Sequence, residues 1–296
     1  MFDRLLFPTD GSDGAAVALD HVLDVAAAHD ATVHVLNVAD TNLDSVTRLG
    51  GEIVDVLERE GEEIVREAAE RADRRGVTTV TEVLQGEPYS TIVDYAGARD
   101  IDLVVMPTRG SRGLERLLLG STTERVVRRS EVPVLTLRPD GGEITYPYRN
   151  VLVPTDGSDC ATAAVDHALS IASVCDATLH ALNVIDESVI VGSPGGVLPA
   201  NYLDSLEQMG EEATDALAER AREQGVDVET AVERGRPGDG IRAYAGDHDV
   251  DLVVMGTHGR SGMERFLLGS TTEQVIRTGT CPVLAVPGGD EETAEE

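Results

Sequence analysis

The 296-residue chain contains no lysine and no tryptophan, and aromatic residues make up only 3% of it. Asp and Glu together number 54 against 24 for Lys and Arg, which gives a formal net charge of -30. Binding to DNA, RNA or anionic membranes depends on positive charge, so this balance argues against those partners. The missing lysine also excludes a P-loop, which needs that side chain for the nucleotide phosphates.

Cysteines and long apolar runs are scarce as well. Cys160, Cys175 and Cys281 cannot build a disulfide framework and are expected to be small buried hydrophobes in a reducing compartment. No apolar run approaches the roughly 18 residues needed to span a bilayer. The chain passes from Met1 directly into Leu5-Leu6-Phe7 without a recognisable targeting segment. These absences predict a soluble, cytoplasmic protein.

The sequence is a tandem repeat. Residues 6–13 recur as 152–159, which is 146 positions later, and residues 120–124 recur as 269–273, which is 149 positions later. The second copy therefore carries three extra residues. We predict a first domain over 1–139, a linker over 140–148, a second domain over 149–288 and an acidic tail over 289–296.

Within each copy, apolar strand-like runs alternate with amphipathic helical stretches. The run 103–106 is uniformly apolar, as buried parallel strands are. The alternation βαβαβαβαβ predicts an α/β fold made of two open parallel five-stranded sheets with helices on both faces. In the first copy we expect strands over 5–8, 32–38, 78–84, 103–106 and 132–137, and helices over 14–29, 53–75, 90–99 and 121–129.

Ligands of such sheets bind beyond the carboxyl ends of the strands, where the strand order reverses. Asp10 and Asp156 follow the first strand of each copy and precede a helix. One interpretation is that these carboxylates bind ribose hydroxyls or help to hold a divalent cation. The alternative is a helix N-cap or a turn aspartate.

A glycine-rich segment follows the fourth strand. In the second copy it contains Gly256, Gly259 and Gly262, which permit positive φ and close backbone approach, so that successive N–H groups can point at one anion. The run Ser270-Thr271-Thr272-Glu273 matches a capping box at a helix start, where free N–H groups and the helix dipole favour phosphate. The alternative is that the glycines only make turns and Ser270 caps its own helix.

These motifs together resemble the universal stress protein family. The resemblance rests on Pro-Thr-Asp-Gly-Ser after the first strand, Leu-Val-Val-Met before the glycine loop, the pattern Gly-x2-Gly-x9-Gly-Ser, and a closing Pro-Val-Leu strand. Gly256-x2-Gly259-x9-Gly269-Ser270 is similar to the ATP-binding subclass of that family. The match covers nearly the whole chain, twice.

The resemblance implies an adenine nucleotide alpha hydrolase-like sheet with strand order 3-2-1-4-5 and a stress-response or regulatory role. It further implies ATP, or another adenine nucleotide, across the strand ends, with Mg²⁺ or Mn²⁺ near the two aspartates and adenine held by the backbone of Val184. The implied nucleotide contacts in the second copy are Pro154, Thr155, Asp156, Val184, Met255, Gly256, Thr257, His258, Gly259, Arg260, Gly262, Gly269, Ser270, Thr271 and Thr272. Those in the first copy are Pro8, Thr9, Asp10, Val38, Arg109, Gly110, Arg112, Gly113, Gly120, Ser121, Thr122 and Thr123.

The first copy departs from this pattern at Pro107, which stands where the second copy has Gly256 and which has no N–H to offer a phosphate. Arg109 replaces His258 and is expected to bring positive charge nearer the phosphates. Members of the family pair through their last strands, so the resemblance implies an internal pseudo-dimer, with further homodimerisation left open.

No catalytic pattern is evident, and His21, His34, His167 and His180 are expected to be structural. Three alternatives to ATP binding are a slow ATPase or nucleotidyl-transfer enzyme, a ligand-free interaction module, and a site for AMP or another adenylate.

The charge composition generates a prediction about salt. A lysine-free surface covered by carboxylates is typical of a protein from a halophile's cytoplasm, where concentrated salt screens the self-repulsion of the charges. We expect dialysis from molar to low salt to unfold or precipitate the protein. Far-UV circular dichroism and light scattering during dialysis measure this, and unchanged folding and solubility at low salt would contradict it.

Overall fold

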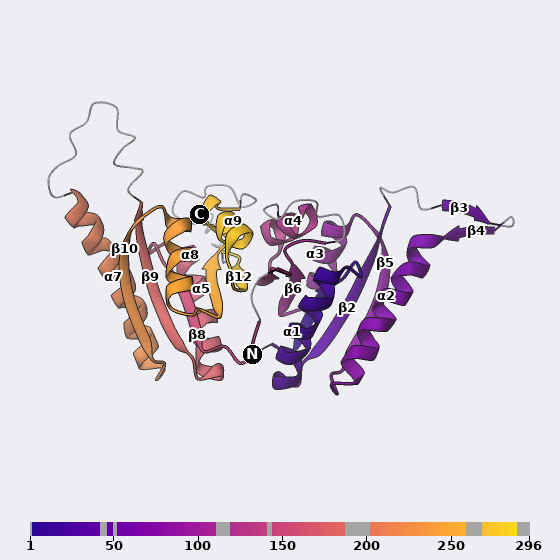
Figure 1. Ribbon diagram of the computed structural model, residues 1–296, viewed down its shortest axis with the longest axis horizontal. Helices are drawn as coiled ribbons and strands as arrows, with labels where there is room; N and C mark the ends of the chain where they lie inside the picture. The colour runs from indigo at the N-terminus through magenta and orange to yellow at the C-terminus, as the bar shows by residue number, and fades with distance from the viewer. Residues whose placement is uncertain are drawn as a thin grey trace, which may run out of the picture. The chain divides into compact units, whose positions relative to one another are not determined.

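The computed structural model describes residues 2–41, 46–49, 52–110, 119–140, 144–186, 202–258 and 268–288. The chain divides into two compact units, Met1–Tyr146 and Pro147–Glu296, and each unit is described by itself (Figure 1). Among the helices of the described residues, none is both long and apolar enough to cross a membrane.

The first unit builds a parallel sheet whose strand order is β5-β2-β1-β6-β7. Numbered by their place among these parallel strands, this is the predicted order 3-2-1-4-5, which is confirmed. The elements in chain order are β1 (Arg4–Pro8), α1 (Asp13–His29), β2 (Thr32–Asp40), β3 (Val46–Leu49), β4 (Glu52–Asp55), α2 (Val56–Asp73), β5 (Thr79–Gly86), α3 (Pro88–Ala98), β6 (Leu103–Pro107), α4 (Ser121–Arg129) and β7 (Val134–Leu137).

The second unit repeats this plan with the strand order β10-β9-β8-β11-β12, again all parallel. The predicted five-stranded α/β sheet is therefore confirmed in both units. The elements are β8 (Asn150–Pro154), α5 (Asp159–Cys175), β9 (Thr178–Asp186), α7 (Tyr202–Glu223), β10 (Val228–Gly235), α8 (Pro237–Asp247), β11 (Leu252–Gly256), α9 (Ser270–Thr278) and β12 (Val283–Val286).

The helix predicted over 53–75 begins later than expected. Residues 52–55 form β4, which pairs antiparallel with β3, and α2 starts at Val56. Ile53 and Val54 are β-branched residues that favour a strand, and they pair with Arg48 and Thr47 of β3. Local β preference therefore overrides the helical periodicity at this end.

The core lies between the sheet and its helices. Leu5, Leu6 and Phe7 of β1 are almost completely buried, as are Leu103 and Val104 of the neighbouring β6. From β1 the chain moves through β2 to β5 toward one edge of the sheet, and it then returns to β6 and β7 toward the other edge. Because crossovers between parallel strands are right-handed, α1 and α2 cover one face of the sheet and α3 and α4 cover the other.

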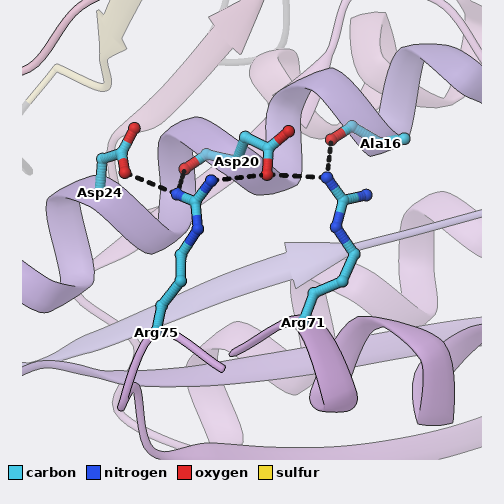
Figure 2. Close-up of polar contacts among 5 residues, drawn as sticks. All are labelled: Ala16, Asp20, Asp24, Arg71 and Arg75. Carbon is cyan, nitrogen blue, oxygen red and sulfur yellow. Dashed lines mark hydrogen bonds and ion pairs between the residues drawn. The ribbon is translucent and has the colours of Figure 1, made fainter. Parts of the chain in front are cut away.

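An ion-pair cluster joins α1 to the last turn of α2 and to the turn that follows it (Figure 2). Asp20 accepts from both Arg71 (2.7 Å) and Arg75 (2.9 Å), and Arg75 also reaches Asp24 at 2.6 Å. Both arginines donate to α1 carbonyls as well, at Ala16 and Asp20. These side chains are partly exposed, so each pair contributes at most about 1 kcal/mol.

Buried His21 generates a pH prediction. It lies in α1 at 2% exposure, and burial lowers its pKa from 6.5 to about 4. The unfolded chain therefore binds this proton more readily than the folded one, and the stability present above the unfolded pKa is lost as the pH falls toward the folded value. From about pH 7 to about pH 5 this group alone should reduce the free energy of unfolding by about 2 kcal/mol.

His21→Gln should flatten this pH dependence, because the variant has nothing to protonate in that range. Chemical denaturation of both proteins in molar salt at the two pH values measures the difference. Equal pH dependence in the variant and the parent would show that His21 is not responsible.

Candidate functional site

The loop after the first strand of each unit is a tight turn built by its own side chains. Asp10 Oδ1 accepts from Ser12 N at 3.1 Å, and Asp156 Oδ1 accepts from Ser158 N at 3.0 Å. The N-caps of α1 and α5 are Ser12 and Ser158, not the aspartates. Each aspartate thus uses one carboxylate oxygen in an Asx turn, which fixes the orientation of its side chain at the strand end.

A strand-two asparagine holds this loop in place. Asn37 Nδ2 donates to Thr9 O at 2.8 Å, and Asn183 Nδ2 donates to Thr155 O at 2.7 Å. Neither asparagine was predicted to have a role. The signal was present in the sequence, because both recur at equivalent positions of the repeat.

The glycine loop is closed at its two ends in both units. Gly269 N donates to Thr257 O at 2.8 Å, and Gly120 N makes the same bond to Thr108 O. The hydroxyl of Thr272 donates to Gly256 O at 2.8 Å, so the first turn of α9 is fastened to the end of β11. The helix start therefore lies beside the strand end from which the loop departs.

The predicted capping box at this helix is wrong. Gly269, not Ser270, is the N-cap of α9, and no side chain makes a capping hydrogen bond there. Ser270 is already the first helical residue, and the Thr272 hydroxyl is directed to the strand carbonyl. The start of α4 is the same, with Gly120 as the N-cap. The N-cap glycine of each helix has no side chain that could accept from the first N–H groups, which have no acceptor within a helix.

In the first unit the two candidate segments meet. A Cβ placed on Gly110 would collide with Asp10 Oδ2, so the carboxylate lies directly against the start of the glycine loop. Thr108, next to the end of β6, is 3% exposed, and its hydroxyl has no hydrogen-bond partner among the described residues. The end of β6 thus carries a buried hydroxyl at Thr108 and, two residues later, a glycine that lies against the Asp10 carboxylate.

Arg109 lies at this point, but its charge is already paired. Its guanidinium donates to Asp140 Oδ1 at 2.5 Å, and Arg138 reaches the same oxygen at 3.3 Å. The hydrogen bond from Arg109 is the largest cause that lowers the pKa of Asp140. The equivalent His258 instead contacts its neighbour, with Nδ1 2.9 Å from Thr257 Oγ1.

The glycine at 256 has a packing reason. A Cβ there would lie 2.7 Å from Cys160 O of α5. Cys160 Sγ would in turn lie 2.8 Å from a Cβ on Gly288. In the first unit the corresponding residues are Pro107, Gly14 and Pro139, and there a Cβ on Gly14 would lie 2.8 Å from the Pro139 ring. In the first unit the larger residue of the facing pair is Pro139 and the smaller is Gly14, whereas in the second unit the larger is Cys160 and the smaller is Gly288.

The remaining candidate residues are placed as follows. Val184 does not end its strand, because β9 continues to Asp186 and Val184 pairs with Glu233 of β10. The side chain of Val184 lies against Gly240 in the first turn of α8. Pro8 and Pro154 end β1 and β8, Val38 lies within β2, Met255 is buried in β11, and Ser121, Thr122, Thr123 and Thr271 lie in the first turns of α4 and α9. Gly259, Arg260, Gly262, Arg112 and Gly113 lie outside the described residues.

The histidines of β2 and β9 form side-chain hydrogen bonds with tyrosines near the amino ends of these strands, opposite the strand ends from which the glycine loops depart. His34 Nδ1 lies 3.0 Å from Tyr95 Oη, and His180 Nδ1 lies 3.2 Å from Tyr244 Oη. Burial is the largest cause that lowers the pKa of both imidazoles. Both residues lie near the amino ends of their strands, away from the glycine loops.

The family model described as the universal stress protein family matches residues 1–138 and 147–287. The chain therefore belongs to the universal stress protein family, and it carries two tandem domains of that kind. The predicted family and tandem organisation are confirmed.

Similar proteins span one or both domains. A universal stress protein of Mycolicibacterium smegmatis is 30% identical over 297 residues, covering 95% of this chain and 96% of its own length. One from Methanocaldococcus jannaschii is 40% identical over 139 residues, covering 47% of this chain and 82% of its own.

Two solved structures are also similar. The crystal structure of a universal stress protein from Archaeoglobus fulgidus has a TM-score of 0.72 at 23% identity and covers 98% of this chain and 100% of its own, which shows a shared fold. A universal stress protein crystallised in complex with cAMP is 29% identical, covers 48% of this chain and 99% of its own, and has a TM-score of 0.37.

A glycine in α7 generates a prediction about the asparagine that positions the first loop. A Cβ on Gly210 would lie 2.5 Å from Asn183 Oδ1 and 3.2 Å from Val232 Cγ1. Gly210→Ala should displace Asn183 and weaken its bond to Thr155, which we expect to destabilise the second unit by about 2 kcal/mol.

Gly246→Ala in α8 is the matched control, because no atom lies within 4 Å of a Cβ there. That variant should be stabilised by roughly 0.5–1 kcal/mol through helix propensity. Chemical denaturation in molar salt compares the two. Equal stability changes would mean that the approach of α7 to Asn183 does not constrain the fold.

Proposed function

We propose that each domain binds an adenine nucleotide, ATP in the first instance, with the phosphates on the glycine loop and on the first turn of the following helix. The role that we assign to the protein is regulatory, within the stress response. Asp10 and Asp156 are proposed to lie near the ribose and to help hold an accompanying Mg²⁺ or Mn²⁺, which would shield the phosphate charge.

The observation that carries the proposal is the start of α9, where the N-cap Gly269 has no side chain to bond the first N–H groups and donates its own N–H to Thr257 O. Free N–H groups at a helix N-terminus bind phosphate through hydrogen bonds and the helix dipole. The Thr272 hydroxyl bonds Gly256 O and so holds this turn at the strand end. The arrangement suits an anion, even though no lysine is available anywhere in the chain.

The residues that converge in the first unit support the same ligand. The Asp10 carboxylate lies against Gly110, and the Thr108 hydroxyl is buried beside them. A carboxylate suits ribose hydroxyls or a divalent cation, whereas the glycine leaves its N–H open to close approach. Because Arg109 is paired with Asp140, we propose that neutral donors make most of the phosphate contacts in this copy.

The first helical residue of α9 offers a direct test. Proline is well tolerated at this position, and the preceding Gly269 already has φ -60 and ψ 138, which a following proline accepts. Ser270→Pro therefore deletes one main-chain N–H with little effect on folding, whereas Ser270→Ala deletes only the hydroxyl. We expect Ser270→Pro to weaken ATP binding at the second site about tenfold or more, and Ser270→Ala to weaken it less.

Isothermal titration calorimetry of the full chain in molar salt with Mg²⁺ measures these affinities. Asp176→Asn at the C-cap of α5 is a control outside the loops, and it should leave the affinity for ATP unchanged. Absence of ATP binding by the parent protein, with AMP and cAMP also failing, would overturn the proposal in favour of a ligand-free interaction module. Phosphate release that Ser270→Pro abolishes would instead favour a slow ATPase.

A further inference from the structure

Three potential metal ligands gather at the amino end of the second sheet, opposite the glycine loop. His180 lies in β9, Glu229 is its partner in the neighbouring β10, and His248 is the C-cap of α8. One ligand atom from each lies within 4.8 Å of the others. Within the described residues this is the one group of three metal-ligating side chains that approach so closely.

The central imidazole of His180 has a polar neighbour at each ring nitrogen. Asn150 Nδ2 donates to Asp249 O at 3.2 Å, which leaves Asn150 Oδ1 facing His180 Nε2 at 3.5 Å. An amide oxygen accepts only, so this contact suits a ring that carries a proton on Nε2. Nδ1, the nitrogen that a metal ion would take, faces Glu229 Oε2 at 3.7 Å and the Tyr244 hydroxyl at 3.2 Å. Such an outer contact is how proteins orient a histidine that binds a metal.

The other two ligands lie at the protein surface. His180 is buried, whereas Glu229 and His248 are exposed. The His248 ring stacks on Tyr244, with centroids 3.9 Å apart, and its centroid is 5.7 Å from that of His180. The ligand atoms of a tetrahedral zinc ion are about 3.3 Å apart. Each pair of ligand atoms therefore has to approach by about 1.5 Å or less, a movement that side-chain rotation can supply.

The first unit provides an internal comparison. His34 and Tyr95 repeat His180 and Tyr244, but Val80, Arg99 and Arg4 replace Glu229, His248 and Asn150. Both arginines lower the pKa of His34 through their charge. Glu82 acts in the opposite sense, but the first unit has no counterpart of Glu229 or His248, so the ligand set belongs to the second unit alone.

We propose that His180, Glu229 and His248 form a binding site for a divalent transition-metal ion, with Zn²⁺ as the best match. Two imidazoles and a carboxylate are a donor set that suits zinc, and they leave a fourth position for water. The ion would tie the edge strand β10 to the end of α8. It would do so without the glycine loop, so this proposal is independent of nucleotide binding.

The test measures Zn²⁺ and Co²⁺ binding to the full chain in molar sodium sulfate, against a competing chelator that strips ions from isolated carboxylates. The parent should hold one Zn²⁺ per chain, raise its midpoint of thermal unfolding when zinc is added, and give the visible absorption of four- or five-coordinate Co²⁺. His248→Arg, which introduces the residue found in the first unit, should reduce affinity at least ~100-fold. Glu229→Gln should reduce it as well.

His167→Gln removes a histidine of α5 outside the cluster and should leave zinc binding unchanged. Circular dichroism checks that His248→Arg folds. No zinc retained by the parent, or equal binding by the parent and His248→Arg, would overturn the proposal. Loss of ATP binding in Ser270→Pro has no bearing on it, since that residue lies at the other end of the sheet.

Discussion

The reversal of strand order beside the first strand is the constraint on which the rest of each unit depends. β1 lies between β2 and β6, and β8 lies between β9 and β11. The chain leaves β1 toward one face of the sheet and leaves β6 toward the other, so both departing loops begin side by side with no helix between them. The turn at Asp10 and the approach of Gly110 to its carboxylate are consequences of that topology.

In the site that we propose, main-chain groups and not charged side chains bind the anion. Arg109, two residues beyond the end of β6, is paired with Asp140. We assign the phosphate contacts instead to the helix starts, which Thr123 and Thr272 fasten to the carbonyls of the preceding strands. In a chain with so large an excess of carboxylates, neutral donors held by the fold avoid competition with internal ion pairs.

Much of the architecture could be predicted from periodicity and self-comparison, because buried parallel strands such as 103–106 have a plain apolar signature. The start of α2 and the cap of α9 could not. Ile53 and Val54 were compatible with either structure until a partner strand was known, and a Ser-x-x-Glu run does not reveal that the glycine before it takes the cap. The His180 cluster was also missed, since its members are far apart in sequence and meet only through the pairing of β9 with β10.

Gly14 faces Pro139 in the first unit, and Cys160 faces Gly288 in the second, so the small and large residues have changed places. This difference limits which substitutions each domain can accept during evolution. Each pair is internally compatible, but a proline opposite Cys160, or a cysteine opposite Pro139, puts two groups in one space. Duplicated segments often exchange sequence by recombination. Here a recombination that transfers one member of a pair produces a strained hybrid, whereas a transfer of both members does not. The two members of each pair therefore have to change together, and single substitutions cannot pass from one domain to the other at these positions.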